Sequence, residues 1–105
     1  MAEQEPLDVG SETQVQTRKN KTKNKRDREE IELRTILDTY GGRAYIWRML
    51  SRCGVFQLSY TGDPQSTFFR EGQRDIGLYI LKEIMTLDPT SFQKMQQEAV
   101  ERDKN

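Results

Sequence analysis

Residues 66–87 read STFFREGQRDIGLYILKEIMTL, and this segment decides the fold. At helical spacing its apolar residues form two stripes, one made of Phe69, Ile76, Ile80, Ile84 and Leu87 and the other of Leu78, Leu81 and Met85. Ser66 or Thr67 is a good N-terminal cap, and Asp88-Pro89 marks the end. Because a helix with apolar residues on two faces is packed by neighbours on both sides, the segment predicts a long central helix.

Two helices are predicted before this segment. The first runs from about Asp27 and ends at Gly41-Gly42, because glycine adopts the left-handed cap conformation cheaply; its apolar face consists of Leu33, Ile36, Leu37 and Tyr40. The second runs from Gly42 to Cys53, with Gly54 as its stop. Residues 55–65 alternate in polarity and contain a turn, but they have no partner strand, so they predict a loop anchored by apolar side chains.

A fourth helix is predicted to open at Asp88 and Pro89, as its N-cap and first position, with Phe92, Met95 and Ala99 on one face. Residues 1–30 hold only five apolar residues and no aromatic, whereas residues 31–105 hold the other 30 and all nine aromatics. The expected fold class is therefore all-α: a small antiparallel bundle of about four helices, with a disordered charged N-terminal arm. The expected domains are the arm, residues 1–26, and a helical domain, residues 27–105.

Charge in the arm is segregated, although the whole chain is formally neutral. An acidic block at residues 3–12 precedes a basic block at residues 18–28, whose bases are Arg18, Lys19, Lys21, Lys23, Lys25, Arg26 and Arg28. These bases predict an arm that neutralises the phosphates of a nucleic acid or another polyanion; contact with about six phosphates would give a log–log salt slope of about −5. No aromatic stands among them, so such binding would be insensitive to sequence. The alternatives are a solvated linker, or bases that pair with the acidic block.

The composition excludes several kinds of segment and site. No apolar run approaches the roughly 18 residues that cross a bilayer, and no signal peptide is visible. One cysteine, Cys53, and no histidine exclude an intramolecular disulfide and Ser-His or Cys-His catalysis, and nearly exclude zinc. We expect Cys53 to be a small buried residue in a reducing compartment, and we expect neither a cofactor nor an enzyme.

The motif Glu71-Gly72-Gln73-Arg74 in the central helix carries a second expectation. Gly72 and Gly77 each cost about 1 kcal/mol inside a helix, which indicates a close crossing by another element. The stem of Arg74 should be partly buried, and Glu71 at i−3 is within reach for a structural ion pair. A ligand-sized pocket around Glu71 and Arg74 would instead favour an enzyme.

Other side chains of the second helix should also find partners. Arg43 opposes the helix dipole, so it should reach Glu71 or a carbonyl of residues 55–65. Trp47 should lie in the core or anchor a loop, together with Tyr45, Phe56 and Phe68, whereas a ring left on the surface would mark a protein interface. The like charges Arg48 and Arg52 indicate an exposed basic strip, which is either a solvated face or a partner surface.

These residues together resemble a known family. The resemblance is carried by Gly42-Arg43, Trp47-Arg48-Met49-Leu50, Cys53-Gly54-Val55-Phe56, Phe68, Glu71-Gly72-Gln73-Arg74, Gly77-Leu78, Phe92 and Met95. Over about residues 33–99 the chain resembles a small tailed-bacteriophage domain family named after a Bordetella phage protein. The resemblance implies a phage protein encoded among head and tail genes, with no known enzymatic activity. It implies that five residues define the fold: Arg43, Glu71, Gly72, Arg74 and Gly77. It does not extend to the charged arm.

The expected function is that of a virion-associated or assembly protein. Its helical domain would dock on other phage structural proteins, and its arm would contact packaged DNA or a second partner. It would be made in the bacterial host cytoplasm, reside in the virion and have no membrane span; a homo-oligomer is compatible with the sequence. The alternative is a nonspecific nucleic-acid-binding accessory protein of the infected cell.

Overall fold

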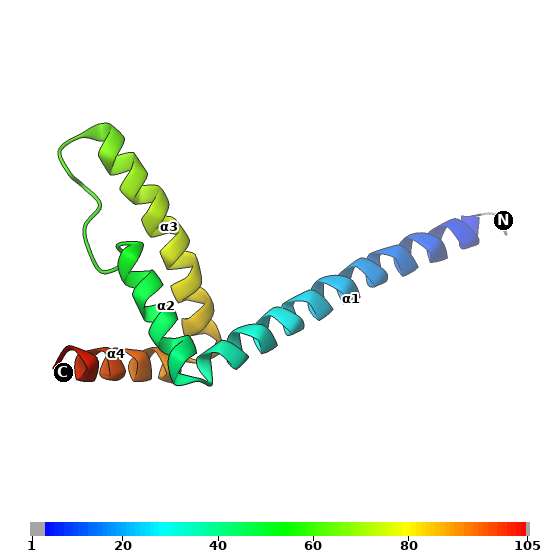
Figure 1. Ribbon diagram of the computed structural model, residues 1–105. Helices are drawn as coiled ribbons and strands as arrows, with labels where there is room; N and C mark the ends of the chain where they lie inside the picture. Colours follow the sequence, from blue (N-terminus) through cyan, green and yellow to red (C-terminus); the bar gives the residue numbers. More distant parts are fainter. Residues whose placement is uncertain (1–3, 105) are drawn as a thin grey trace. The chain divides into compact units, whose positions relative to one another are not determined.

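The computed structural model describes residues 4–104, and the side chains of residues 12–104. This part of the chain contains four helices and no strand: α1 (Gln4–Leu37), α2 (Tyr40–Arg52), α3 (Pro64–Leu87) and α4 (Pro89–Lys104) (Figure 1). The prediction of an all-α fold with four helices is confirmed. The chain divides into two compact units between Glu32 and Leu33. None of the four helices combines the length and the apolar content that a membrane span requires.

The second unit is a bundle whose core lies where α2, α3 and α4 meet. Helices α2 and α3 run antiparallel, joined by residues 53–63, and α4 packs on both of them near the start of α2 and the end of α3 (Figure 1). Leu50, Ile84 and Met95 are fully buried at this centre. Leu37, Ile46, Val55 and Ala99 are also buried, and half-buried side chains of Leu33, Trp47, Cys53, Ile80, Leu81 and Phe92 pack around the core.

The corner between α1 and α2 differs from the sequence prediction. Helix α1 ends at Leu37, and both Gly41 and Gly42 lie in the first turn of α2, so the prediction that these glycines end the first helix is wrong. The N-cap of α2 is Thr39, whose Oγ1 accepts a hydrogen bond from the Gly42 amide at 3.0 Å. A Cβ at Gly42 would overlap the carbonyl oxygen of Ile36. Gly42 therefore permits a close approach of the chain at this corner, rather than a left-handed cap.

The ends of the other helices agree more closely with the capping residues predicted from the sequence. Gly54 follows α2 with φ +73°, which confirms it as the stop of this helix. Helix α3 is capped by Asp63, whose Oδ2 accepts from the Ser66 amide at 2.9 Å, and not by Ser66 or Thr67 as predicted. Asp63 precedes Pro64, a pair that supplies both the cap and the preferred first residue. Asp88 repeats this arrangement at α4, as predicted, and its Oδ1 accepts from the Thr90 amide at 3.2 Å.

The first unit consists of the part of α1 that precedes Leu33. Helix α1 begins at Gln4, so the helix start predicted near Asp27 is corrected toward the N-terminus. Residues 12–32 are rich in helix-forming Gln, Lys, Arg and Glu and contain neither glycine nor proline, which favours this continuation. Every side chain from residue 12 to residue 32 is exposed. A helix that is polar on all sides gains nothing from packing, so this segment still meets the expectation of an arm without a core of its own.

Helix α3 is less enclosed than predicted. Its buried residues are Gly77 and Ile84, with Ile80 and Leu81 half-buried beside them. The prediction that neighbours cover both apolar stripes is wrong, because α2 and α4 pack on one side only, and Phe69, Ile76, Leu78 and Met85 remain exposed. A large part of the apolar surface of this helix is therefore available to something outside the bundle.

Candidate functional site

Arg43 is the charged side chain that ties the bundle together. It is only 7% exposed, and its Nε and Nη2 donate to the two carboxylate oxygens of Glu98 at 2.7 and 3.1 Å. Its Nη1 donates to the carbonyl oxygen of Leu37, at the end of α1, at 2.8 Å. The prediction of Glu71 or a carbonyl of residues 55–65 as its partner is wrong. Glu98 lies 55 residues further along the chain, on α4, and no spacing in the sequence links it to Arg43.

This ion pair changes the acidity of both groups. The hydrogen bond from Arg43 lowers the pKa of Glu98, although partial burial opposes the change. The same hydrogen bond raises the pKa of Arg43. Both groups are therefore held in their charged forms, and the pair joins α1, α2 and α4 inside the bundle.

The motif Glu71-Gly72-Gln73-Arg74 does not form the ion pair that was predicted. Glu71 accepts a hydrogen bond from Ser59 Oγ and so fastens the loop of residues 53–63 to α3. The Nε of Arg74 is buried and has no hydrogen-bond partner. Among residues 12–104 no salt bridge joins Arg74 to a carboxylate. The motif thus holds a loop in place and leaves one guanidinium group unpaired.

The two glycines of α3 lie in different surroundings. A Cβ at Gly77 would be 2.7 Å from Cys53 Cβ and would also overlap the side chain of Val55, so Gly77 allows the end of α2 and the following loop to pack tightly on α3. A Cβ at Gly72 would have no heavy atom within 4 Å. The close crossing predicted for both glycines is therefore present at Gly77 and missing at Gly72.

Three aromatic rings anchor the loop to the bundle. The ring of Trp47 stacks on Phe56 with centroids 5.1 Å apart, and Phe92 lies beside both rings at 6.0 and 6.4 Å. The other two aromatics that were expected in the core lie elsewhere. Tyr45 is exposed and carries the guanidinium of Arg48 over its ring, and Phe68 projects from the N-terminal half of α3.

One side of α3 carries a row of large, exposed apolar side chains, and Phe69 at its N-terminal end also lines the cleft described below. Phe69, Gly72, Ile76 and Tyr79 follow one another at spacings of three and four residues, so they share one face of the helix, and Phe68 borders them. Phe68, Phe69, Ile76 and Tyr79 are 73%, 68%, 61% and 62% exposed. We call these five residues the outer face of α3. Exposed rings were the sign set out above for a protein interface.

A cleft opens between the end of α2, the loop of residues 53–63 and the N-terminal half of α3. Its volume is about 730 Å³, which is the size of a small-molecule site. Arg52, Arg70 and Arg74 line it, and Asp63 is its acidic residue. The ligand-sized pocket named above as favouring an enzyme is thus present beside Arg74, although Glu71 does not line it. Its chemistry is that of three guanidinium groups rather than of an acid–base pair.

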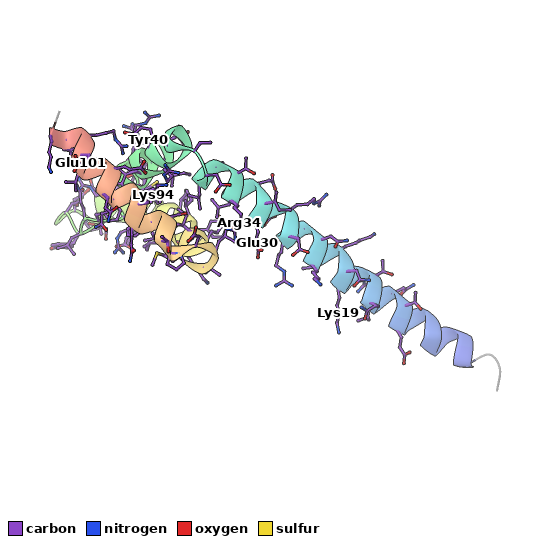
Figure 2. The ribbon with its side chains drawn as sticks, turned by 90° about the horizontal axis from the view of Figure 1, so that it is seen from below. Lys19, Glu30, Arg34, Tyr40, Lys94 and Glu101 are labelled. Atoms are coloured by element: carbon purple, nitrogen blue, oxygen red, sulfur yellow. The ribbon has the colours of Figure 1, made fainter. Side chains whose placement is uncertain are left out.

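The seven bases of the arm lie on α1 and are all exposed. Figure 2 labels Lys19 as one of them. On a helix they divide between two sides. Arg18, Lys21, Lys25 and Arg28 share one side, at spacings of three and four residues, and Lys19, Lys23 and Arg26 share another. Lys25 also lies 4.0 Å from Glu29 in a solvated pair. A helical arm can therefore present about four bases to one polyanion at a time.

The comparison with protein families identifies the helical domain. The family described as Bbp19-like phage protein matches residues 33–97. The chain belongs to this family. No curated protein and no solved structure matches the chain.

The match to the Bbp19-like family begins where the second compact unit begins, at Leu33. The matched residues include Arg43, the three neighbouring rings of Trp47, Phe56 and Phe92, the outer face of α3 and the three arginines of the cleft. It ends just before Glu98, the partner of Arg43. All seven bases of the arm precede it, so they lie outside the matched region.

Proposed function

We propose that this Bbp19-like protein is a virion-associated or assembly protein that docks on another phage structural protein and catalyses no reaction. The observation that carries the proposal is the exposure of the outer face of α3. Folded monomers rarely leave a contiguous patch of large apolar side chains in water unless the patch is used for binding. The proposed protein is made in the host cytoplasm and becomes part of the particle.

The composition of the outer face suits a protein partner. Aromatic side chains at the centre of an interface carry much of its binding energy, and Phe68, Phe69 and Tyr79 supply three of them. Full burial of a side chain such as Ile76 is worth about 1.5–3 kcal/mol. Gly72 leaves a gap between Phe69 and Ile76, into which a side chain of the partner would fit.

The experiment that tests this proposal measures the chain in purified, DNase-treated particles. Wild type should be retained. Ile76→Glu should be lost, because a carboxylate would have to enter the interface without a partner. Val100→Glu is the matched control: Val100 is 52% exposed on α4, so the same charge at that position should be tolerated. Absence of the wild-type chain from particles, or equal retention of both variants, would contradict the proposal.

The arm is proposed to contact packaged DNA through one side of α1. Four phosphate contacts predict a log–log salt slope of about −3.6, shallower than the value of about −5 for six contacts. Replacement of the seven bases by glutamine should abolish the slope, and this variant should still enter particles, since it keeps the outer face of α3. Retention of full salt-dependent binding by the variant would rule out the arm as the DNA contact.

The alternative is a nonspecific nucleic-acid-binding accessory protein of the infected cell. It is favoured by one observation, the seven exposed bases that the Bbp19-like match leaves outside. The two functions predict different locations. The accessory protein would bind DNA with the same salt dependence but would be absent from particles, and Ile76→Glu would not change its DNA binding.

A further inference from the structure

We propose that the cleft between residues 53–63 and α3 is a binding site for a phosphate group, held by Arg74 together with Arg52 and Arg70. All three arginines line the same cleft of about 730 Å³. This inference does not depend on the docking of α3 or on the arm.

The arginines of the bundle separate into two groups by their partners. Arg43 pairs with Glu98, and Arg48 lies over the ring of Tyr45. Arg102 lies over the ring of Tyr40 and donates to its hydroxyl at 3.0 Å. In contrast, among the described residues no salt bridge or ring contact joins any of the three cleft arginines to a partner. Among the described residues of the bundle, Arg34 on α1 also has no such partner, so three of its four unpaired guanidinium groups are gathered at this one cleft.

The nearby carboxylates are already engaged and do not neutralise the cleft. Asp63 caps α3 through the Ser66 amide, and this hydrogen bond lowers the pKa of Asp63. Glu71 accepts from Ser59 and does not line the cleft. With three positive charges and one negative charge, the lining has a formal charge of +2, which matches a dianion.

Arg74 provides the most demanding part of the site. A buried donor without an acceptor is costly, and its Nε has none. Because this atom is buried, the Arg74 side chain would have to turn toward the cleft for a phosphate oxygen to accept from it, and Arg52 and Arg70, which line the same cleft, could donate to the other oxygens. A single carboxylate is a poorer match, because in this protein the pair of Arg43 and Glu98 shows that one guanidinium already satisfies one carboxylate through both oxygens.

The walls of the cleft indicate that the phosphate belongs to an ester. Phe69 and Leu58 both line the cleft and are 68% and 88% exposed, so they offer an apolar surface next to the arginines. An organic group attached to the phosphate could rest there. The phosphate could come from a free nucleotide or from the end of a nucleic-acid strand, which share this chemistry.

The test is a titration of the isotopically labelled full chain with inorganic phosphate at constant ionic strength, followed by NMR. The Nε–H signal of Arg74 and the amides of residues 53–63 should shift and saturate, whereas acetate should not shift them. Arg52→Gln and Arg70→Gln should each weaken binding about tenfold, the loss expected for one charge-assisted hydrogen bond. Both residues are exposed, so these variants should fold even if Arg74→Gln does not. Arg48→Gln, outside the cleft, should bind like wild type.

Two further ligands distinguish the sources of the phosphate. Tighter binding of a nucleoside monophosphate than of inorganic phosphate supports a free ester, and tighter binding of a 5′-phosphorylated oligonucleotide than of the unphosphorylated one supports a strand end. Both outcomes keep the phosphate site. The proposal is overturned if the cleft signals do not saturate, if acetate is as effective as phosphate, or if Arg52→Gln and Arg70→Gln bind as tightly as wild type.

Discussion

At the scale of single residues, Arg43 has the largest structural role. It is the buried charged side chain of the described core, and it needs both Glu98 and the Leu37 carbonyl to satisfy its donors. A buried ion pair adds little net stability compared with apolar packing, but removal of one partner leaves the other charge buried and unpaired. The pair therefore acts as a constraint on how α1, α2 and α4 meet.

Glu98→Gln should lower the free energy of unfolding by about 1.5–3 kcal/mol, because a neutral amide replaces a charge-assisted partner of buried Arg43. Urea unfolding measures the change. Glu101→Gln is the control, since Glu101 is exposed and has only a long contact of 3.4 Å to Lys104. Equal stability of wild type and Glu98→Gln would mean that the pair places no constraint on the fold.

The same pair predicts a pH dependence. Because the pKa of Glu98 is lowered in the folded state, its contribution is complete above the ordinary carboxyl pKa and is lost as the pH falls through the lowered value. Wild type should therefore lose more stability than Glu98→Gln as the pH falls below the ordinary carboxyl pKa. The contribution of Asp63, whose pKa is also lowered, is common to both proteins and cancels. Parallel pH profiles of the two proteins would contradict the assignment.

The glycines of α3 give a matched pair of substitutions. Gly77→Ala should destabilise by about 1–3 kcal/mol, because its Cβ would press on Cys53 and Val55. Gly72→Ala should stabilise by about 0.5–1 kcal/mol, since it meets no atom and alanine is the better helix former. Thermal unfolding of both variants checks the signs. Destabilisation by Gly72→Ala would show that the surface at Gly72 is already covered in the free protein.

At the scale of elements, the sequence predicts where helices exist better than how they meet. Apolar periodicity and Asp-Pro caps are local signals, so α2, α3 and α4 could be expected close to their observed bounds. The corner at Gly42 could not, because its reason is a close contact with the Ile36 carbonyl that only the folded corner reveals. The pairing of Arg43 with Glu98 could not be expected either, because Glu98 is distant in the chain and Glu71 carries the same charge.

Helix α1 shows that a high helix propensity does not by itself imply packing against the rest of the protein. Its residues 12–32 favour a helix one by one, but no described side chain among them is buried. Hydrogen exchange of the free protein should therefore show rapid exchange of the amides of residues 12–32 and slow exchange around Leu50 and Ile84. Strong protection of residues 12–32 would contradict this expectation.

At the scale of the whole molecule, the arm and the domain differ in what they expose. The Bbp19-like domain, residues 33–97, holds the fold, the outer face of α3 and the arginine cleft, and the arm supplies exposed bases. The sequence predicts an arm of residues 1–26 and a helical domain of residues 27–105, whereas the two compact units divide between Glu32 and Leu33. The sequence did not predict the outer face of α3, because an apolar stripe reads the same whether its own bundle or a partner covers it.

The most direct measurement is photocrosslinking in assembled particles. A photoreactive phenylalanine analogue placed at Tyr79 lies on the outer face of α3, and the same analogue at Tyr45 is a control of similar exposure on α2. The account predicts that the analogue at position 79 crosslinks to another phage protein and that the analogue at position 45 does not. Crosslinks from position 45 but none from position 79, or no crosslink from either, would contradict it.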